Sequence, residues 1–84
     1  MTKNTVLITG GSGFLGINLC RFLHNKGYEI KVIDISPFDY SDMKNKIEFI
    51  EGDIRNLELL KNATKDVDFV VHTEAALPLW PKED

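Results

Sequence analysis

The feature that most constrains this chain is its glycine-rich stretch at residues 10–16. It holds four of the six glycines, at positions 10, 11, 13 and 16. An apolar run at residues 6–8 precedes it, and a helical pattern follows it. A strand, a glycine turn and a helix in this order direct backbone N–H groups and the positive end of a helix dipole to one place. The stretch therefore predicts a binding site for a phosphate group.

The glycine spacing matches the dinucleotide-binding pattern G-x-G-x-x-G. Gly11, Gly13 and Gly16 meet it literally, and a second register starts at Gly10. We expect Gly10 to permit the tight turn, Gly13 to let the backbone approach a diphosphate, and Gly16 to let the helix pack closely on the first strand. Asp34 lies 18 residues after Gly16, at the end of the next predicted strand. Its carboxylate would accept hydrogen bonds from ribose hydroxyls and repel a 2′-phosphate, which favours NAD over NADP.

Hydrophobic patterning predicts four strands and two helices. The strands are expected at residues 5–9, 29–34, 47–50 and 67–71, and the helices at residues 13–26 and directly after Asn56. The first helix is expected to end at Gly27 and to pack through Leu15, Leu19, Cys20 and Leu23. Because crossovers between parallel strands are right-handed, this element order predicts a parallel sheet with strand order 3-2-1-4 and one helix on each face. The predicted fold is a partial Rossmann fold of the α/β class.

Composition and charge exclude several classes of function. The 84 residues are 43% hydrophobic and 27% charged, which is typical of one small globular domain. The net charge of -3 comes without a basic block, so neither nucleic acid nor an anionic membrane surface is an expected partner. No apolar run approaches the ~20 residues of a membrane-spanning helix. The single cysteine, Cys20, excludes an internal disulfide and a cysteine metal site, and favours a cytoplasmic location.

Four features of the chain carry a resemblance to a known family. They are TGGSGFLG at residues 9–16, Asp34, EGDI at residues 51–54 and VVHTEAA at residues 70–76. In this order and spacing they resemble the NAD-dependent epimerase/dehydratase family, the extended branch of the short-chain dehydrogenases/reductases. The resemblance covers essentially the whole chain. It implies an oxidoreductase that acts on nucleotide sugars with NAD as its cofactor.

The resemblance also implies cofactor contacts for individual residues. Phe14 and Leu15 would line the turn around the diphosphate. Asp53 would bond the adenine amino group, and Ile54 would pack on the adenine ring. Contacts near the ribose and the diphosphate are implied for two residues after the fourth strand, Thr73 and Ala75.

The chain departs from the family pattern at one position and lacks a second feature. The family usually carries a small residue where this chain has Glu74. A carboxylate within ~4 Å of a diphosphate costs roughly 1–4 kcal/mol, whereas a Glu74 side chain turned to solvent costs nothing; both outcomes stay open. The family's catalytic Tyr-x-x-x-Lys pair lies beyond residue 84. A literal match, Tyr40 to Lys44, falls between the second and third strands, and we interpret it as coincidence.

We therefore expect residues 1–84 to form the N-terminal half of an NAD-binding Rossmann domain, without a catalytic or substrate domain and without activity of its own. The alternatives are a non-enzymatic Rossmann-type binding or oligomerisation module, and an inert fragment. The fourth strand, at residues 67–71, would present an open apolar edge, which predicts a homo-oligomer formed through that strand. For His72, which follows it, a structural role is favoured over a catalytic one, because no nucleophile or carboxylate partner lies nearby in the sequence.

Overall fold

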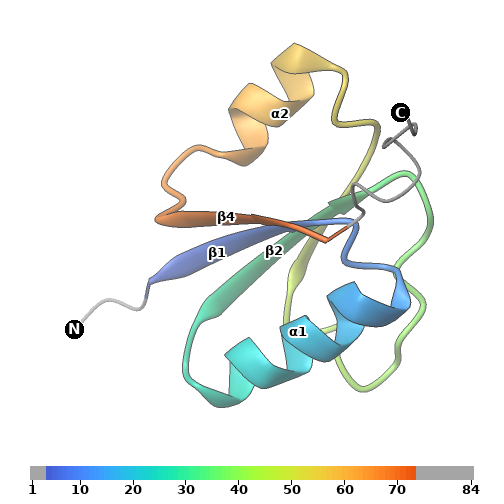
Figure 1. Cartoon of the computed structure of the whole chain (residues 1–84), viewed down its shortest axis with the longest axis vertical. Coiled ribbons are helices and arrows are strands. Elements are labelled where there is room, and N and C mark those ends of the chain that lie inside the picture. The colour runs from blue at the N-terminus through green and yellow to red at the C-terminus, as the bar shows by residue number, and fades with distance from the viewer. Residues whose placement is uncertain (1–3, 74–84) are drawn as a thin grey trace, which may run out of the picture.

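A computed structural model shows a four-stranded parallel sheet between two helices (Figure 1). The structure describes residues 4–73. The sheet has the strand order β3-β2-β1-β4, and α1 and α2 cover its opposite faces (Figure 1). The predicted partial Rossmann fold is thus confirmed. The elements are β1 (Thr5–Thr9), α1 (Phe14–Asn25), β2 (Glu29–Asp34), β3 (Glu48–Glu51), α2 (Leu57–Ala63) and β4 (Phe69–His72).

The sheet divides the core into two clusters of unequal size. Successive residues of a strand point to opposite faces, so the apolar runs of β1 and β2 supply both clusters. The cluster on the side of α1 consists of Val6, Ile8, Ile17, Cys20, Ile30, Val32, Phe38 and Met43. The smaller cluster on the side of α2 consists of Leu7, Ile33 and Ala63. The larger cluster anchors α1, the helix that follows the glycine loop.

The helix α1 begins directly after Gly13 and ends before Gly27, as the sequence predicts within one residue at each end. Gly27 has φ of +94°, and its N–H donates to the carbonyl of His24 at 3.0 Å. Burial raises the pKa of the Cys20 thiol to about 11 against a smaller opposing effect of Arg21, so this cysteine packs as an apolar residue. The predicted packing of Leu15 on the inner face of α1 is wrong. Its side chain is 62% exposed, because the first turn of α1 borders a cavity instead of the sheet.

Side chains hold α2 at both of its ends. Asn56 Oδ1 accepts a hydrogen bond from the N–H of Leu59 at 3.2 Å, which confirms the predicted N-cap. Beyond the other end, Lys31 Nζ of β2 donates to the carbonyl of Lys65 at 3.2 Å. The helix is therefore attached to the sheet by polar contacts as well as by its apolar face. Neither helix in residues 4–73 has the length and apolar content to cross a membrane.

The strand β4 begins two residues later than the sequence predicts. Asp66 has φ of +62°, which makes a turn, and Val67 packs against the smaller core cluster. Asp68 then exchanges two hydrogen bonds with Thr5: its N–H donates to the Thr5 carbonyl at 2.9 Å, and its Oδ2 accepts from the Thr5 N–H at 2.7 Å. Regular pairing with β1 therefore starts only at Phe69.

Candidate functional site

Most of the predicted site residues gather around one cavity at the carboxyl ends of β1 and β2. Its volume is about 230 Å³. This is below the roughly 300–1,000 Å³ of a complete small-molecule site, so the cavity would hold one part of a dinucleotide. Seven of the ten predicted residues line it, together with Ser12 and Ser36. The seven are Gly10, Gly13, Phe14, Leu15, Gly16, Asp34 and Thr73.

Two glycines shape the loop between β1 and α1. Gly10 has φ of +78°, a conformation that residues with a Cβ rarely adopt, and its N–H donates to the Ile33 carbonyl at 2.9 Å. This agrees with the tight turn predicted there. At Gly13, an added Cβ would have Gly10 O at 3.6 Å as its nearest neighbour, which is an ordinary contact. The protein alone therefore does not require glycine at position 13, whereas a ligand that approaches the backbone would.

Two further glycines are required by close packing. A Cβ at Gly16 would collide with the carbonyl oxygen of Gly10 and with the backbone of Gly11. The sequence predicts that Gly16 packs on β1, but the atoms nearest to it belong to the glycine loop that follows β1. A Cβ at Gly11 would lie 2.5 Å from Val32 Cγ1, a contact that the sequence analysis missed. The loop is thus pressed between α1 and β2.

The first turn of α1 leaves backbone donors beside the cavity. The N–H groups of Phe14, Leu15 and Gly16 have no acceptor within residues 4–73, because the first internal bond of the helix runs from the Ile17 N–H to the Gly13 carbonyl at 2.9 Å. The first turn carries no acidic side chain. The helix dipole adds partial positive charge at this end. These donors can bind an anion such as a diphosphate.

Asp34 is held in place by two backbone donors. Its Oδ2 accepts from the N–H of Ser12 at 3.0 Å, and its Oδ1 accepts from the N–H of Ser36 at 2.9 Å. The Ser12 hydroxyl donates to the Ser36 carbonyl at 2.9 Å and closes this network. Each carboxylate oxygen keeps a free lone pair, so both can still accept a hydrogen bond from a hydroxyl group. The sequence predicts Asp34 but not the two serines that orient it.

The end of β4 is attached to the glycine loop. The Thr73 hydroxyl lies 2.8 Å from the carbonyl oxygen of Thr9 and 3.0 Å from that of Gly10. The Thr73 N–H also donates to the Thr9 carbonyl at 3.0 Å. His72 Nδ1 lies 2.8 Å from the hydroxyl oxygen of Thr9, which is fully buried. These contacts support the structural role expected of His72.

Three predicted residues are not among those that line the cavity. Asp53 binds Arg55 of the same loop, with Oδ2 2.6 Å from Nη2, and the hydrogen bonds from Arg55 lower the pKa of the Asp53 carboxyl to about 2. Ile54 packs against the smaller core cluster. Ala75 lies outside the described residues, as does Glu74. The predicted adenine and ribose contacts of these residues stay predictions.

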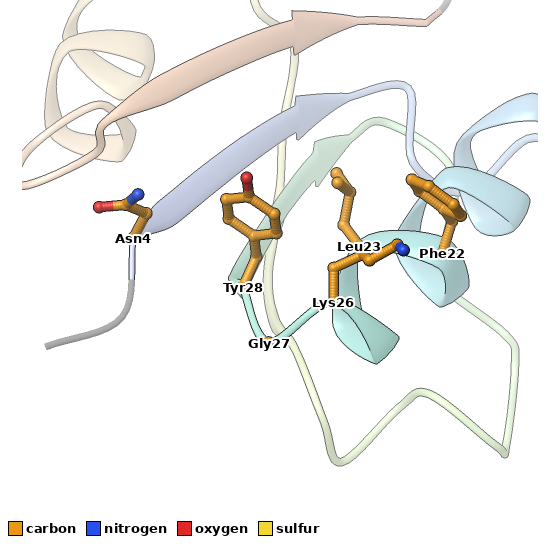
Figure 2. Close-up of a pocket in the computed structure, with 6 residues that line it drawn as sticks. All are labelled: Asn4, Phe22, Leu23, Lys26, Gly27 and Tyr28. Carbon is orange, nitrogen blue, oxygen red and sulfur yellow. The ribbon is translucent and has the colours of Figure 1, made fainter. Parts of the chain in front are cut away.

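A larger cavity lies at the opposite end of α1 (Figure 2). Its volume is about 540 Å³, and it is lined by Asn4, Phe22, Leu23, Lys26, Gly27 and Tyr28. Lys26 Nζ lies 5.4 Å from the centroid of the Phe22 ring, so the ammonium group already has an aromatic partner. The C-terminal end of a helix carries partial negative charge, and none of the predicted site residues lies here. None of these observations indicates an anion site at this end of α1.

The sequence matches the NAD dependent epimerase/dehydratase family over residues 6–83. The chain belongs to this family. It is 38% identical over 71 residues to "Short-chain dehydrogenase/reductase family 42E member 1" of Xenopus laevis, covering 84% of this chain and 18% of that protein. It is also 38% identical over 74 residues to "3-beta-hydroxysteroid dehydrogenase" of Mycolicibacterium neoaurum, covering 88% of this chain and 20% of that protein.

Two solved structures show the same fold. The dTDP-glucose 4,6-dehydratase of Bacillus anthracis in complex with NAD has a TM-score of 0.76 and 28% identity, covering 90% of this chain and 28% of that chain. An epimerase of Methanothermobacter thermautotrophicus has a TM-score of 0.74 and 35% identity, covering 88% of this chain and 23% of that chain. The present chain spans less than a third of the length of each of these four proteins.

NAD is the cofactor of this family, and the cavity at the glycine loop fits one part of it. Free N–H groups at the start of α1 match a diphosphate. The open side of Gly13 leaves room for the ligand to approach the backbone. The oriented carboxylate of Asp34 matches the hydroxyl groups of a ribose.

Proposed function

We propose that this chain supplies the N-terminal, NAD-binding part of an oxidoreductase of the nucleotide-sugar epimerase/dehydratase type. One observation carries the proposal: the free N–H groups of Phe14, Leu15 and Gly16 share a cavity with the oriented carboxylate of Asp34. The diphosphate would lie at the N-terminus of α1, and the adenosine ribose against Asp34. Membership of an NAD-dependent family supports this arrangement.

The residues of this chain bind and orient the adenosine half of the cofactor. NAD, when bound, supplies a hydride acceptor for the oxidation of an alcohol carbon of the substrate. We assign no catalytic step to Tyr40 and Lys44, because the Tyr40 hydroxyl is already bonded to the carbonyl of Ser12 at 2.6 Å. In this proposal the role of residues 1–84 is to bind the cofactor, and the chain alone does not catalyse a reaction.

The proposed substrate class is a nucleotide sugar. A relative with bound NAD acts on dTDP-glucose, as its name states, and it shares the fold of this chain with a TM-score of 0.76. The relative from Mycolicibacterium neoaurum, whose name states a hydroxysteroid dehydrogenase, is 38% identical to this chain and makes a steroid alcohol the second candidate. The cavity at the glycine loop would bind the cofactor in the same way for either substrate.

We also propose a homo-oligomer that forms through β4, in a cytoplasmic protein. Phe69 and Val70 are 51% and 45% exposed, and within residues 4–73 the strand β4 pairs with β1 alone. An apolar strand edge of this kind can pair with another chain. Light scattering should therefore show a dimer or larger species that Val70→Lys dissociates. A monomer at all concentrations would refute this part of the proposal.

Titration with NADH tests the proposed binding function. In a calorimetric titration NADH should bind the chain saturably, and NADPH should bind about tenfold more weakly because Asp34 repels the 2′-phosphate. Equal affinity for the two cofactors would contradict the role of Asp34. The absence of binding at millimolar NADH would refute the proposal. The remaining alternatives would be an oligomerisation module or an inert fragment, and the oligomeric state measured by light scattering would distinguish them.

A further inference from the structure

The loop between β2 and β3 contacts the glycine loop through Tyr40. The Tyr40 hydroxyl donates to the carbonyl oxygen of Ser12 at 2.6 Å, although 28 residues separate the two in the sequence. Tyr40 is partly buried and belongs to the motif that was interpreted as coincidence. The family resemblance assigns no role to Tyr40, although this hydrogen bond places it against the glycine loop.

The Tyr40 contact restrains one particular peptide, the one that joins Ser12 and Gly13. Its carbonyl accepts from Tyr40, and its N–H, which belongs to Gly13, donates to the Gly10 carbonyl at 3.1 Å. The C=O and N–H of a trans peptide point in opposite directions, so these two bonds hold both polar ends. Glycine readily adopts alternative backbone conformations, so a peptide that ends at Gly13 rotates easily unless something opposes it.

Tyr40 is itself held from two sides. Its ring packs edge to face on the buried Phe38, with ring centroids 5.2 Å apart and an interplanar angle of 69°. The Arg21 guanidinium carbon lies 5.8 Å from the centroid of the Tyr40 ring. Arg21 donates from Nε and Nη2 to the two carboxylate oxygens of Asp42 at 2.9 and 3.1 Å, and these bonds lower the pKa of the Asp42 carboxyl. We call Arg21, Tyr40 and Asp42 the Tyr40 clasp.

We propose that Tyr40 is a positioning residue that prevents rotation of the Ser12–Gly13 peptide and so keeps the glycine loop in its anion-binding conformation. A rotated peptide would turn the Ser12 carbonyl oxygen away from Tyr40, and a carbonyl oxygen turned toward the cavity would repel a diphosphate. The clasp joins this peptide to α1 through Arg21 and to the loop after β2 through Asp42. The identity of the anion rests on the proposed function, whereas the restraint on the peptide does not.

The ligand-free chain tests the restraint by itself. Tyr40→Phe removes only the hydroxyl group and keeps the ring on Phe38. Tyr28→Phe is the matched control, because Tyr28 lies at the far end of α1 (Figure 2). Hydrogen exchange of the Gly13 amide, followed by NMR, should be about fivefold faster in Tyr40→Phe than in the wild type and unchanged in Tyr28→Phe. Unchanged exchange in Tyr40→Phe would overturn the proposal, whatever happens to the melting temperature.

NADH titration tests the consequence for binding. Tyr40→Phe should weaken the affinity for NADH about fivefold, and Tyr28→Phe should leave it unchanged. Faster exchange of Gly13 with unaltered NADH affinity would overturn the positioning role. A wild-type chain that does not bind NADH would refute the proposed function, while the exchange measurement would still decide whether the restraint exists.

A second variant keeps the test valid if Tyr40→Phe fails to fold. The side chains of Arg21 and Asp42 are 43% and 54% exposed, so neutralising Asp42 leaves the core intact. Asp42→Asn should speed Gly13 exchange and weaken NADH binding about twofold at low salt, with a smaller effect at high salt, where the ion pair is screened. If neither the Gly13 exchange rate nor the NADH affinity changes at low salt, the role of the clasp is overturned.

Discussion

The two ends of α1 each border a cavity, and the larger cavity lies at the end where the backbone N–H groups are already hydrogen-bonded. At the C-terminal end the cavity has about 540 Å³, against about 230 Å³ at the N-terminal end. The N–H of Lys26 donates to the carbonyls of Phe22 and Leu23, and the N–H of Gly27 donates to that of His24. The donors at this end are therefore already hydrogen-bonded. At the N-terminal end, the N–H groups of residues 14–16 have no acceptor within residues 4–73.

Under the proposed function the ligand binds at the end of α1 with the smaller cavity, so cavity volume is not what distinguishes the two ends. A charged ligand needs polar groups that the fold leaves unpaired and that are already oriented. The N-terminal end has both, in the free N–H groups and in the carboxylate of Asp34, which two backbone donors hold. Substitutions at the two ends should therefore have different consequences for stability and for cofactor binding.

The largest effect is expected from Gly16→Ala. The added Cβ would collide with the backbone of Gly10 and Gly11, so the free energy of unfolding should fall by on the order of 3 kcal/mol and NADH binding should be lost. Gly27→Ala is the control at the other end of α1. A Cβ added at Gly27 would meet no atom within 4 Å, but the backbone at this position has a φ of +94°. It should cost about 1–2 kcal/mol and leave the NADH affinity of the folded chain unchanged. Urea denaturation and NADH titration would measure both, and equal stability of the two variants would contradict the packing account.

The next largest effect is expected from Asp34→Ala. It removes the proposed acceptor for the ribose hydroxyls and the observed acceptor of the Ser12 and Ser36 N–H groups, so NADH affinity should fall about 10- to 100-fold. Asp39→Ala removes the same charge from an exposed position of the neighbouring loop and serves as the control. Calorimetric titration would compare the two. A similar loss in both variants would mean that overall charge, not the placement of Asp34, governs affinity.

Gly13→Ala should separate binding from folding. The added Cβ makes only an ordinary contact, with Gly10 O at 3.6 Å, so the free energy of unfolding should change by less than about 1 kcal/mol. The methyl group would stand between the backbone and the diphosphate, so NADH affinity should fall about tenfold. Denaturation and titration of the same sample would test this. A stability loss as large as that of Gly16→Ala would show that position 13 is structural.

The smallest effect is expected from pH at Asp53, which is not among the residues that line either cavity. Hydrogen bonds from Arg55 lower the pKa of the Asp53 carboxyl to about 2 from an ordinary value of 3.8. A lowered folded-state pKa adds stability above pH of about 4, and this contribution is lost as the pH falls toward about 2. Arg55→Gln should raise the pKa toward its ordinary value in a carboxyl NMR titration. NADH affinity at neutral pH would change only if Asp53 contacts the adenine, as the family resemblance implies.

The backbone of this protein could be predicted from the sequence because its signals are local. Continuous apolar runs indicated strands covered on both faces, and Gly27 and Asn56 marked helix ends. The strand order then followed from the handedness of the crossovers. The start of β4 was missed, because Val67 is as apolar as the strand that follows but packs beside α2 after the turn at Asp66.

The polar network around the site could not be predicted in the same way. The bonds of Ser12 join it to residues 22 to 28 positions away, such as Asp34 and Tyr40, and no periodicity in the sequence encodes them. One signal was available. Ser36 lies two residues after Asp34, the spacing at which an aspartate accepts from a nearby backbone N–H. Arg21 and Asp42 carried no such signal, because both are exposed charged residues of a common kind.

The hydrogen bonds of Asp34 have a consequence for the redesign of cofactor preference. Its carboxylate is itself an anion bound by two converging backbone donors, the N–H groups of Ser12 and Ser36. A smaller neutral residue at position 34 would remove the negative charge and also vacate this small anion pocket. The 2′-phosphate of NADP could then accept hydrogen bonds from these two N–H groups in place of the carboxylate. The carboxylate that we propose selects against NADP therefore occupies the anion pocket in which the 2′-phosphate of NADP could bind.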